Sequence, residues 1–227
     1  MSGEGAVRRR RWPRRLLRVL VVALVVLAAL GAGGWFWLRG RLEASLPQLD
    51  GKATVPGLGA PASVERDALG VPTVRGSSRL DVARALGFLH GQERFFQMDL
   101  LRRGAAGELA ALLGAPLVGS DRRLRAHRFR EIAGRSLHEA SPEIRDLLTG
   151  YSDGVNAGLR SLDAPAPEYV LLRTEPVPWK TEDSLLVLSA MFLQLQDSSG
   201  GTDRARGLIL ETLPLELSEF LMPAGTE

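Results

Sequence analysis

The residues of this chain that could carry out chemistry are few, and they form no known catalytic set. The chain has no cysteine, which excludes disulfides, thiolate zinc sites and a cysteine nucleophile. Its three histidines, His90, His127 and His138, are far apart and lack metal-ligand spacing, so each is interpreted as a surface or capping residue. The HExxH, Walker-loop, GxGxxG and GxSxG patterns are also absent from the sequence. The residues alone therefore predict no catalytic group and no metal site.

One charged cluster, at residues 99–103, has a spacing that carries meaning. Asp99 lies three residues before Arg102 and four before Arg103. On a helix, these separations place the carboxylate beside both guanidinium groups. The cluster is therefore predicted to be an ion pair that supports a helix.

The net charge of +3 comes from the amino terminus. Residues 1–18 hold seven arginines and one acidic residue, and without them the 29 basic and 26 acidic residues fall to 22 and 25. A nucleic-acid-binding domain needs a basic face that displaces counterions from phosphates. The remainder of the chain has no such excess, so nucleic acid is not expected as a partner.

An uncharged run of twenty residues, 19–38, follows the arginines. As a helix it would span about 30 Å, the thickness of a hydrocarbon core. The arginines favour a basic cytoplasmic tail at residues 1–18, and Trp35 and Trp37 suit the outer interface. Residues 19–38 are therefore predicted to be a transmembrane anchor with an extracytoplasmic (periplasmic) body. A cleaved signal sequence is the alternative, because residues 29–32 offer small side chains to a peptidase.

The body is predicted to be α+β and predominantly helical. Residues 39–62, rich in proline and glycine, read as a linker. Two short strands fit 63–66 and 71–75, too few for a stable sheet alone. Helical periodicity begins at Asp81, the expected N-cap, and returns at 108–113, 142–159, 181–195 and 203–213. Within the first helix, Gly87 and Gly91 predict a smooth patch where another backbone approaches closely.

Several segments resemble the penicillin acylase (penicillin amidase) family, in the same order and at similar spacing. DALGVPTV at 67–74 is similar to the family's D-x-x-G-V-P-x-[IV] opening. The long and specific block at 85–114, ALGFLHGQERFFQMDLLRRGAAGELAALLG, is followed by YSDGVNA at 151–157, PEY at 167–169 and PWKTEDS at 178–184. Residues 63–227 are therefore identified as a penicillin-acylase-like α-chain region, incomplete as an enzyme.

The resemblance implies a precursor that cleaves itself into α and β chains, which interleave in the four-layer αββα fold of N-terminal-nucleophile hydrolases. The family's nucleophile is a serine that begins the β chain, and its own α-amino group can serve as the base. The family's Gly-Ser-Asn does not occur in this sequence. The chain is thus expected to be inactive alone and to need a β-chain segment, from the same precursor or from a neighbouring reading frame.

The resemblance also implies that this chain supplies one wall of the acyl pocket. Residues 191–198 resemble a helix that in penicillin acylases presents a methionine, an arginine and a phenylalanine to the substrate. Those positions hold Met191, Gln194 and Leu195 here. Without the arginine, a partner for an acidic substrate group is lost, and without the phenylalanine a phenylacetyl preference is not implied. On spacing alone, Met191 and Leu195 equally fit a helix core.

Taken together, these features predict the α-chain part of an acylase that hydrolyses the linear amide of a small N-acylated molecule. The substrate would be a β-lactam antibiotic side chain or an N-acyl homoserine lactone. The alternative is a non-catalytic, membrane-anchored remnant or a helical binding module. The family also binds a structural calcium, whose glutamate position corresponds to Gly201, with Asp203 the nearest carboxylate. Because most calcium ligands would come from the β part, no ligand is assigned in this chain.

Overall fold

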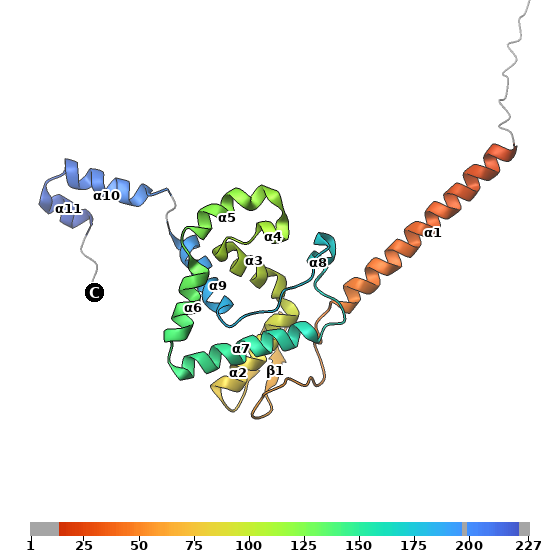
Figure 1. Ribbon diagram of the computed structural model, residues 1–227, viewed down its shortest axis with the longest axis horizontal. Coiled ribbons are helices and arrows are strands. Elements are labelled where there is room, and N and C mark those ends of the chain that lie inside the picture. Colours follow the sequence, from red (N-terminus) through yellow and green to blue (C-terminus); the bar gives the residue numbers. More distant parts are fainter. Residues whose placement is uncertain (1–13, 197–198, 223–227) are drawn as a thin grey trace, which may run out of the picture. The chain divides into compact units, whose positions relative to one another are not determined.

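The computed structural model describes residues 14–196 and 199–222 (Figure 1). It divides into two compact units, Met1–Phe96 with Gly150–Pro178 (the first unit) and Gln97–Thr149 with Trp179–Glu227 (the second unit). The described part of the chain is rich in helix and has one small sheet, as predicted. Its elements are α1 (Arg14–Ala44), β1 (Ser63–Arg66), β2 (Pro72–Arg75), α2 (Arg79–Glu93), α3 (Phe95–Ala106), α4 (Ala110–Leu113), a 3₁₀ turn (Ala115–Leu117), α5 (Val118–Arg125), α6 (Phe129–Glu139), α7 (Pro142–Arg160), α8 (Pro167–Leu172), α9 (Asp183–Leu195), α10 (Gly201–Thr212) and α11 (Leu215–Leu221).

Helix α1 contains the uncharged run at residues 19–38 and extends beyond it at both ends. Among residues 14–196 and 199–222, it is the one helix both long enough and apolar enough to cross a membrane. Its large apolar side chains are exposed, Trp35 and Trp37 among them. A signal sequence near an amino terminus can also be this apolar, so residues 19–38 fit both interpretations.

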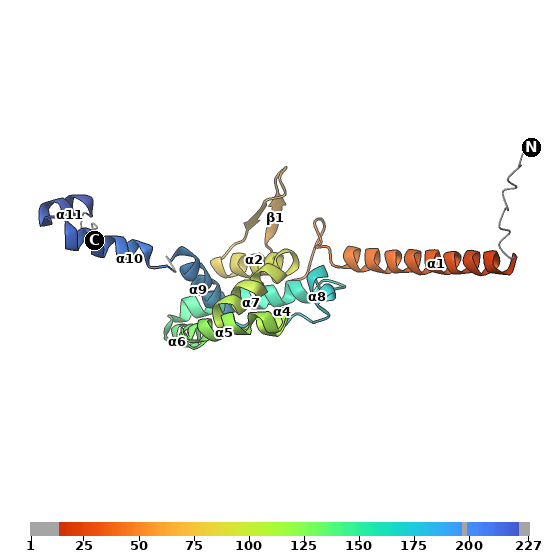
Figure 2. The same ribbon diagram turned by 90° about the horizontal axis from the view of Figure 1, so that it is seen from above.

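The two predicted strands pair as an antiparallel hairpin, β1–β2. The hairpin projects from the first unit beside α2 (Figure 2). Its turn is held by the carboxylate of Asp67, which accepts two backbone N–H donors at 2.9 Å each. Gly70 completes the turn at φ +78°, a conformation that glycine adopts without strain. Both faces of such a hairpin need further packing, because two strands alone are marginal in water.

Helix α2 begins at a different cap from the predicted one. Ser78 is the N-cap, and its hydroxyl oxygen accepts the backbone N–H of Asp81 at 3.1 Å. The same hydroxyl donates to the Asp81 carboxylate at 2.7 Å, which gives a reciprocal capping arrangement. The carboxylate also accepts the N–H of Gly59 at 2.7 Å. Hydrogen bonds from Ser78 and Gly59 hold the pKa of Asp81 below its usual value. The prediction of Asp81 as the cap was wrong by one helical turn.

Helices α2 and α7 lie side by side (Figure 1). They meet through four glycines, which we call the glycine seam. Gly87 and Gly91 of α2 face α7, while Gly154 and Gly158 of α7 face α2. A Cβ atom added at any of them would lie less than 3.0 Å from a backbone carbonyl oxygen of the opposite helix. The smooth patch predicted at Gly87 and Gly91 is confirmed. The matching pair on α7 was not predicted.

The second unit has a core made largely of small side chains. Ala105 and Ala106 of α3, Ala133 of α6 and Leu186 of α9 are buried together. Phe129, Leu185 and Ala190 are partly buried against them. Three helices from distant parts of the sequence therefore meet through methyl-sized contacts, and α9 takes its place against α3 and α6.

Candidate functional site

The candidate site is helix α9, whose two halves have opposite surroundings. At its beginning Asp183 and Leu186 are buried, with 1% and 0% of their surface exposed. Toward its end Leu188, Met191, Phe192 and Leu195 are 60%, 55%, 54% and 76% exposed. These four follow the i, i+3, i+4, i+7 spacing of a single helix face. We call them the apolar face of α9.

The buried beginning of α9 is fixed by its first residue. The Asp183 carboxylate accepts the backbone N–H of Lys180 at 2.8 Å, which closes the turn that leads into the helix. A carboxylate at this position also interacts favourably with the positive end of the helix dipole. The neighbouring Trp179 is buried and donates from its indole nitrogen to the Ser184 hydroxyl at 3.2 Å. The segment before α9 is thereby tied to its first turn.

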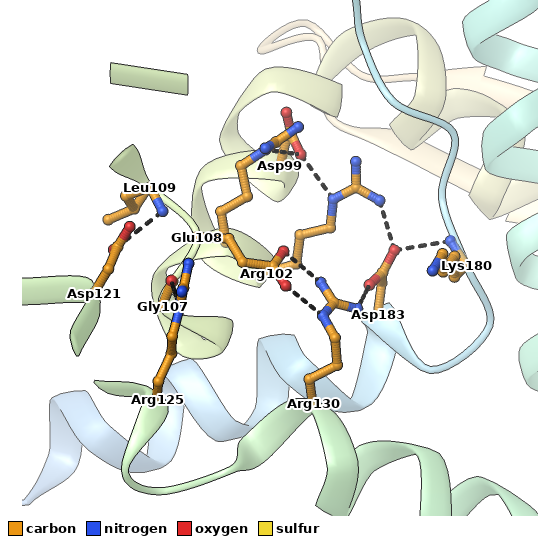
Figure 3. Close-up of polar contacts among 11 residues, drawn as sticks. Asp99, Arg102, Gly107, Glu108, Leu109, Asp121, Arg125, Arg130, Lys180 and Asp183 are labelled. Atoms are coloured by element: carbon orange, nitrogen blue, oxygen red, sulfur yellow. Dashed lines mark hydrogen bonds and ion pairs between the residues drawn. The ribbon is translucent and has the colours of Figure 1, made fainter. Parts of the chain in front are cut away.

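Asp183 also belongs to a buried set of charges, which we call the ion network (Figure 3). Arg102 of α3 donates from Nε to Asp99 Oδ1 at 2.7 Å and from Nη1 to Asp183 Oδ2 at 2.5 Å. All three side chains are at most 4% exposed. The Arg102 guanidinium lies over the Trp179 ring, 5.0 Å from its centroid. Ion pairs buried to this degree are stable only when each charge is matched and hydrogen-bonded, as it is here.

A second, less buried arm of the ion network reaches Asp183 from α6. Arg130 donates to both oxygens of Glu108, at 2.7 and 2.8 Å, and to Asp183 Oδ1 at 3.0 Å. The paired hydrogen bonds with Glu108 raise the pKa of Arg130 above its ordinary value, and Asp183 adds to the effect. Arg103 completes the ion network by donating to Asp99 at 2.8 Å. Three carboxylates and three arginines thus balance one another.

The ion network was only partly predicted from the sequence. The pairing of Asp99 with Arg102 and Arg103 is confirmed, but its burial and its link to α9 were not foreseen. Arg102 and Asp183 are 81 positions apart, so local spacing cannot reveal their contact. The sequence did contain an indication that these residues matter. Two segments that carry the family resemblance, 85–114 and 178–184, include five of the network residues: Asp99, Arg102, Arg103, Glu108 and Asp183.

The three predicted substrate-binding residues lie on the exposed half of α9. Met191 and Leu195 belong to its apolar face, and Gln194 is exposed beside them. Neither Met191 nor Leu195 is buried in the core of the second unit, where their spacing would also have suited them. Their role in binding a substrate stays a prediction.

The histidines are not brought together in the structure. His90 is half-buried in the first unit, and its Nδ1 lies 2.8 Å from the Tyr151 hydroxyl. Burial lowers the pKa of His90 and raises the pKa of Tyr151 to about 12. His127 stacks on Phe129 at 5.2 Å between ring centroids, and His138 is exposed. His90 is therefore a packed residue, which corrects its interpretation as a surface or capping residue.

The residues near the position that corresponds to the family's calcium site offer few ligands. Gly201 begins α10 and Asp203 follows in its first turn. Within residues 14–196 and 199–222, no three side chains of histidine, cysteine, aspartate or glutamate are grouped as a metal site requires. A calcium ion needs six to eight oxygen ligands. The described residues do not fit such a site by themselves, and no step of the chemistry is assigned to a metal.

Comparison with known proteins indicates one family. The penicillin amidase family model matches residues 61–225. The penicillin acylase 2 proenzyme of Pseudomonas sp. (strain SE83) is 42% identical over 156 residues, covering 68% of this chain and 20% of the relative. An acyl-homoserine lactone acylase, QuiP, of Pseudomonas fluorescens (strain Pf0-1) is 30% identical over 204 residues, covering 89% of this chain and 24% of that protein.

A solved structure is similar as well. A thermostable penicillin G acylase from Alcaligenes faecalis matches with a TM-score of 0.56 and 26% identity, over 74% of this chain and 96% of the solved chain. The family model covers well over half of the sequence. This chain belongs to the penicillin amidase family, whose members are acylases that hydrolyse amides. It spans about a fifth of the length of the curated relatives.

Proposed function

We propose that this chain is the α part of an acylase that hydrolyses the linear amide bond of a small N-acylated molecule. In this proposal the apolar face of α9 forms one wall of the acyl pocket. A β part, from the same precursor or from a neighbouring reading frame, supplies the serine nucleophile and completes the αββα fold. The proposal is supported by the family match and by relatives described as a proenzyme and as acylases.

The observation that carries the proposal is the contrast within α9. In a self-contained globular domain, large apolar side chains such as Met191, Phe192 and Leu195 would be buried. Here each of them is more than half exposed, although the beginning of the helix is fixed by buried charges. Exposed apolar patches on an ordered element indicate a ligand or partner surface. The fixed beginning and exposed end suit a pocket wall, which has to be apolar and held in place.

The side chains on this wall favour an aliphatic acyl group. Leu195 takes the position of a phenylalanine in the family pattern, and Gln194 that of an arginine. A leucine leaves a wider, flexible aliphatic surface, and a glutamine provides no cation for an acidic substrate. We propose that a fatty acyl amide such as an N-acyl homoserine lactone is preferred over a phenylacetyl β-lactam.

The proposal also places the chain at a membrane, with its body on the extracytoplasmic side. The uncharged run at residues 19–38, within α1, follows seven arginines, which suits an anchor with a cytoplasmic basic tail at residues 1–18. Mass spectrometry of the mature amino terminus distinguishes an anchor from a signal sequence. An intact residue 1 in the membrane fraction supports the anchor, and a new terminus near residue 33 indicates cleavage.

The direct test is to express the full chain with and without a β part, from its own locus or from the related proenzyme. Release of p-nitroaniline from decanoyl and phenylacetyl anilides reports amide hydrolysis. We expect hydrolysis only when both parts are present and purify together. The alternative of a non-catalytic remnant or binding module predicts no hydrolysis and no joint purification with either β part.

A further inference from the structure

We infer that the ion network selects the length of the acyl chain, because it sets the tilt of α9 and thus the depth of the pocket that its apolar face lines. This inference rests on the proposed function. None of the network residues belongs to the apolar face. They would therefore act as positioning residues, through the helix.

The first step concerns leverage. Asp183 is the first residue of α9, and Leu195 is its last. At 1.5 Å per residue, these two positions are about 18 Å apart along the helix axis. A change in tilt of about 10° at the Asp183 end would therefore move Leu195 by roughly 3 Å. A displacement of this size alters which acyl chain fills an apolar pocket.

The second step concerns what else could fix the tilt. The inward face of α9 packs mainly on Ala105, Ala106 and Ala133, with Phe129 of α6 partly buried against the same cluster. Methyl groups offer shallow ridges and grooves, so they limit the crossing angle between helices less than large interlocking side chains do. Asp183 accepts a guanidinium hydrogen bond on each of its carboxylate oxygens, from Arg102 on Oδ2 and from Arg130 on Oδ1. Charge-assisted hydrogen bonds are strong and have a preferred geometry. The charged contacts supply the orientation that the alanines leave open.

The third step concerns the difference between the two arms that meet at Asp183. The arm formed by Arg102 and Asp183 is buried, with 4% of the arginine side chain exposed. The Arg130–Glu108 arm is 34% exposed on both partners. Changes in the second arm leave the buried pair of Arg102 and Asp183 matched. This arm can therefore be altered without unfolding the unit, and it is the one to test.

The test uses the assembled enzyme, the full chain with its β part, carrying Arg130→Lys or Glu108→Gln. Lysine keeps the charge of Arg130 but cannot hold both oxygens of Glu108. Glu131→Gln is the matched control for Glu108→Gln. It neutralises a glutamate of α6 whose ion pair, with Arg128, is exposed to solvent. The readouts are kcat and KM on butanoyl and decanoyl p-nitroanilides, with the thermal unfolding midpoint measured alongside.

We expect both variants to change the ratio of decanoyl to butanoyl kcat/KM by about tenfold, mainly through KM, a size typical of a misfitted apolar pocket. The control should leave this ratio within about twofold. An equal loss on both substrates, with or without a lower midpoint, would mean a merely structural role and would overturn the inference. No hydrolysis by the unaltered assembly overturns the proposed function, and the inference with it.

Discussion

The two units of this chain hold their helices together by opposite means. In the first unit, the glycine seam joins α2 and α7 by removing side chains, so that backbone meets backbone. In the second unit, the ion network joins α3, α6 and α9 through long arginine side chains that pair with the Asp183 carboxylate. The glycine seam leaves no space for change. The ion network has one partly exposed arm, Arg130 with Glu108, in which a side chain can be changed.

This difference indicates a division of labour. A contact between backbones fixes the spacing of two helices and depends little on conditions. A network of side-chain charges can adopt slightly different geometries, and it lies at the beginning of the helix that carries the candidate pocket wall. On the proposed function, the glycine seam serves as a scaffold and the ion network supports the candidate pocket wall.

The largest effect is expected from Gly91→Ala, which would place a methyl group against the carbonyl oxygen of Val155. The helices must separate, at a cost of about 3 kcal/mol or more in free energy of unfolding. Thermal unfolding of the detergent-solubilised protein measures it. Gly134→Ala is the control, since nothing lies within 4 Å of its added Cβ, and alanine should raise helix stability by up to about 1 kcal/mol. Equal stability of the two variants would refute the glycine seam.

A somewhat smaller loss is expected from Asp183→Asn, which removes the negative charge that Arg102 and Arg130 share and replaces one of its two acceptor oxygens with an NH2 donor. Breaking a buried ion pair by neutralising one partner typically costs about 3 kcal/mol. Chemical denaturation of the assembled protein measures the change. Asp153→Asn is the matched control, since Asp153 pairs with Arg84 while its own side chain is 58% exposed, and it should cost less than about 1 kcal/mol. Similar losses in both variants would contradict the importance of burial.

The smallest effect is a pH dependence next to the glycine seam. Burial lowers the pKa of His90, Arg94 lowers it further, and Glu93 opposes them. The folded protein therefore prefers neutral His90. The stability is complete above the unfolded pKa of about 6.5 and decreases as the pH falls below it. Unfolding midpoints at pH 7.5 and 5.0 measure the decrease, and His90→Gln should reduce it. An identical decrease in the variant would assign the effect to other groups.

The features that could be predicted from the sequence are those that depend on residues close together in the chain. The β1–β2 hairpin, the smooth patch at Gly87 and Gly91, and the long helices α7 and α9 follow from turn residues, glycine spacing and periodicity. The cap of α2 was missed because Ser78 and Asp81 are both good capping residues and only their reciprocal contact distinguishes them. Helices α5, α8 and α11 have only six to eight residues each, too few for periodicity to predict them, and α6 was not predicted either.

The sequence supplied the three residues proposed for the candidate site, whose role stays a prediction, but not the contacts that hold their helix. Resemblance to the family pointed to Met191, Gln194 and Leu195, while their exposure on a fixed helix required the structure. The ion network joins segments that lie up to 81 positions apart, and no local pattern contains that information. Ion pairs between residues this far apart in the chain could not be predicted from the sequence.

The most direct test of the pocket wall is Leu195→Phe in the assembled enzyme, measured as the ratio of phenylacetyl to decanoyl anilide hydrolysis. Leu69→Phe, in the exposed turn of the β1–β2 hairpin, is the control. We expect the ratio to rise by about tenfold for Leu195→Phe, since the ring narrows an aliphatic pocket and contacts an aromatic acyl group, and to stay unchanged for Leu69→Phe. An unchanged ratio for both variants would show that α9 does not line the acyl pocket.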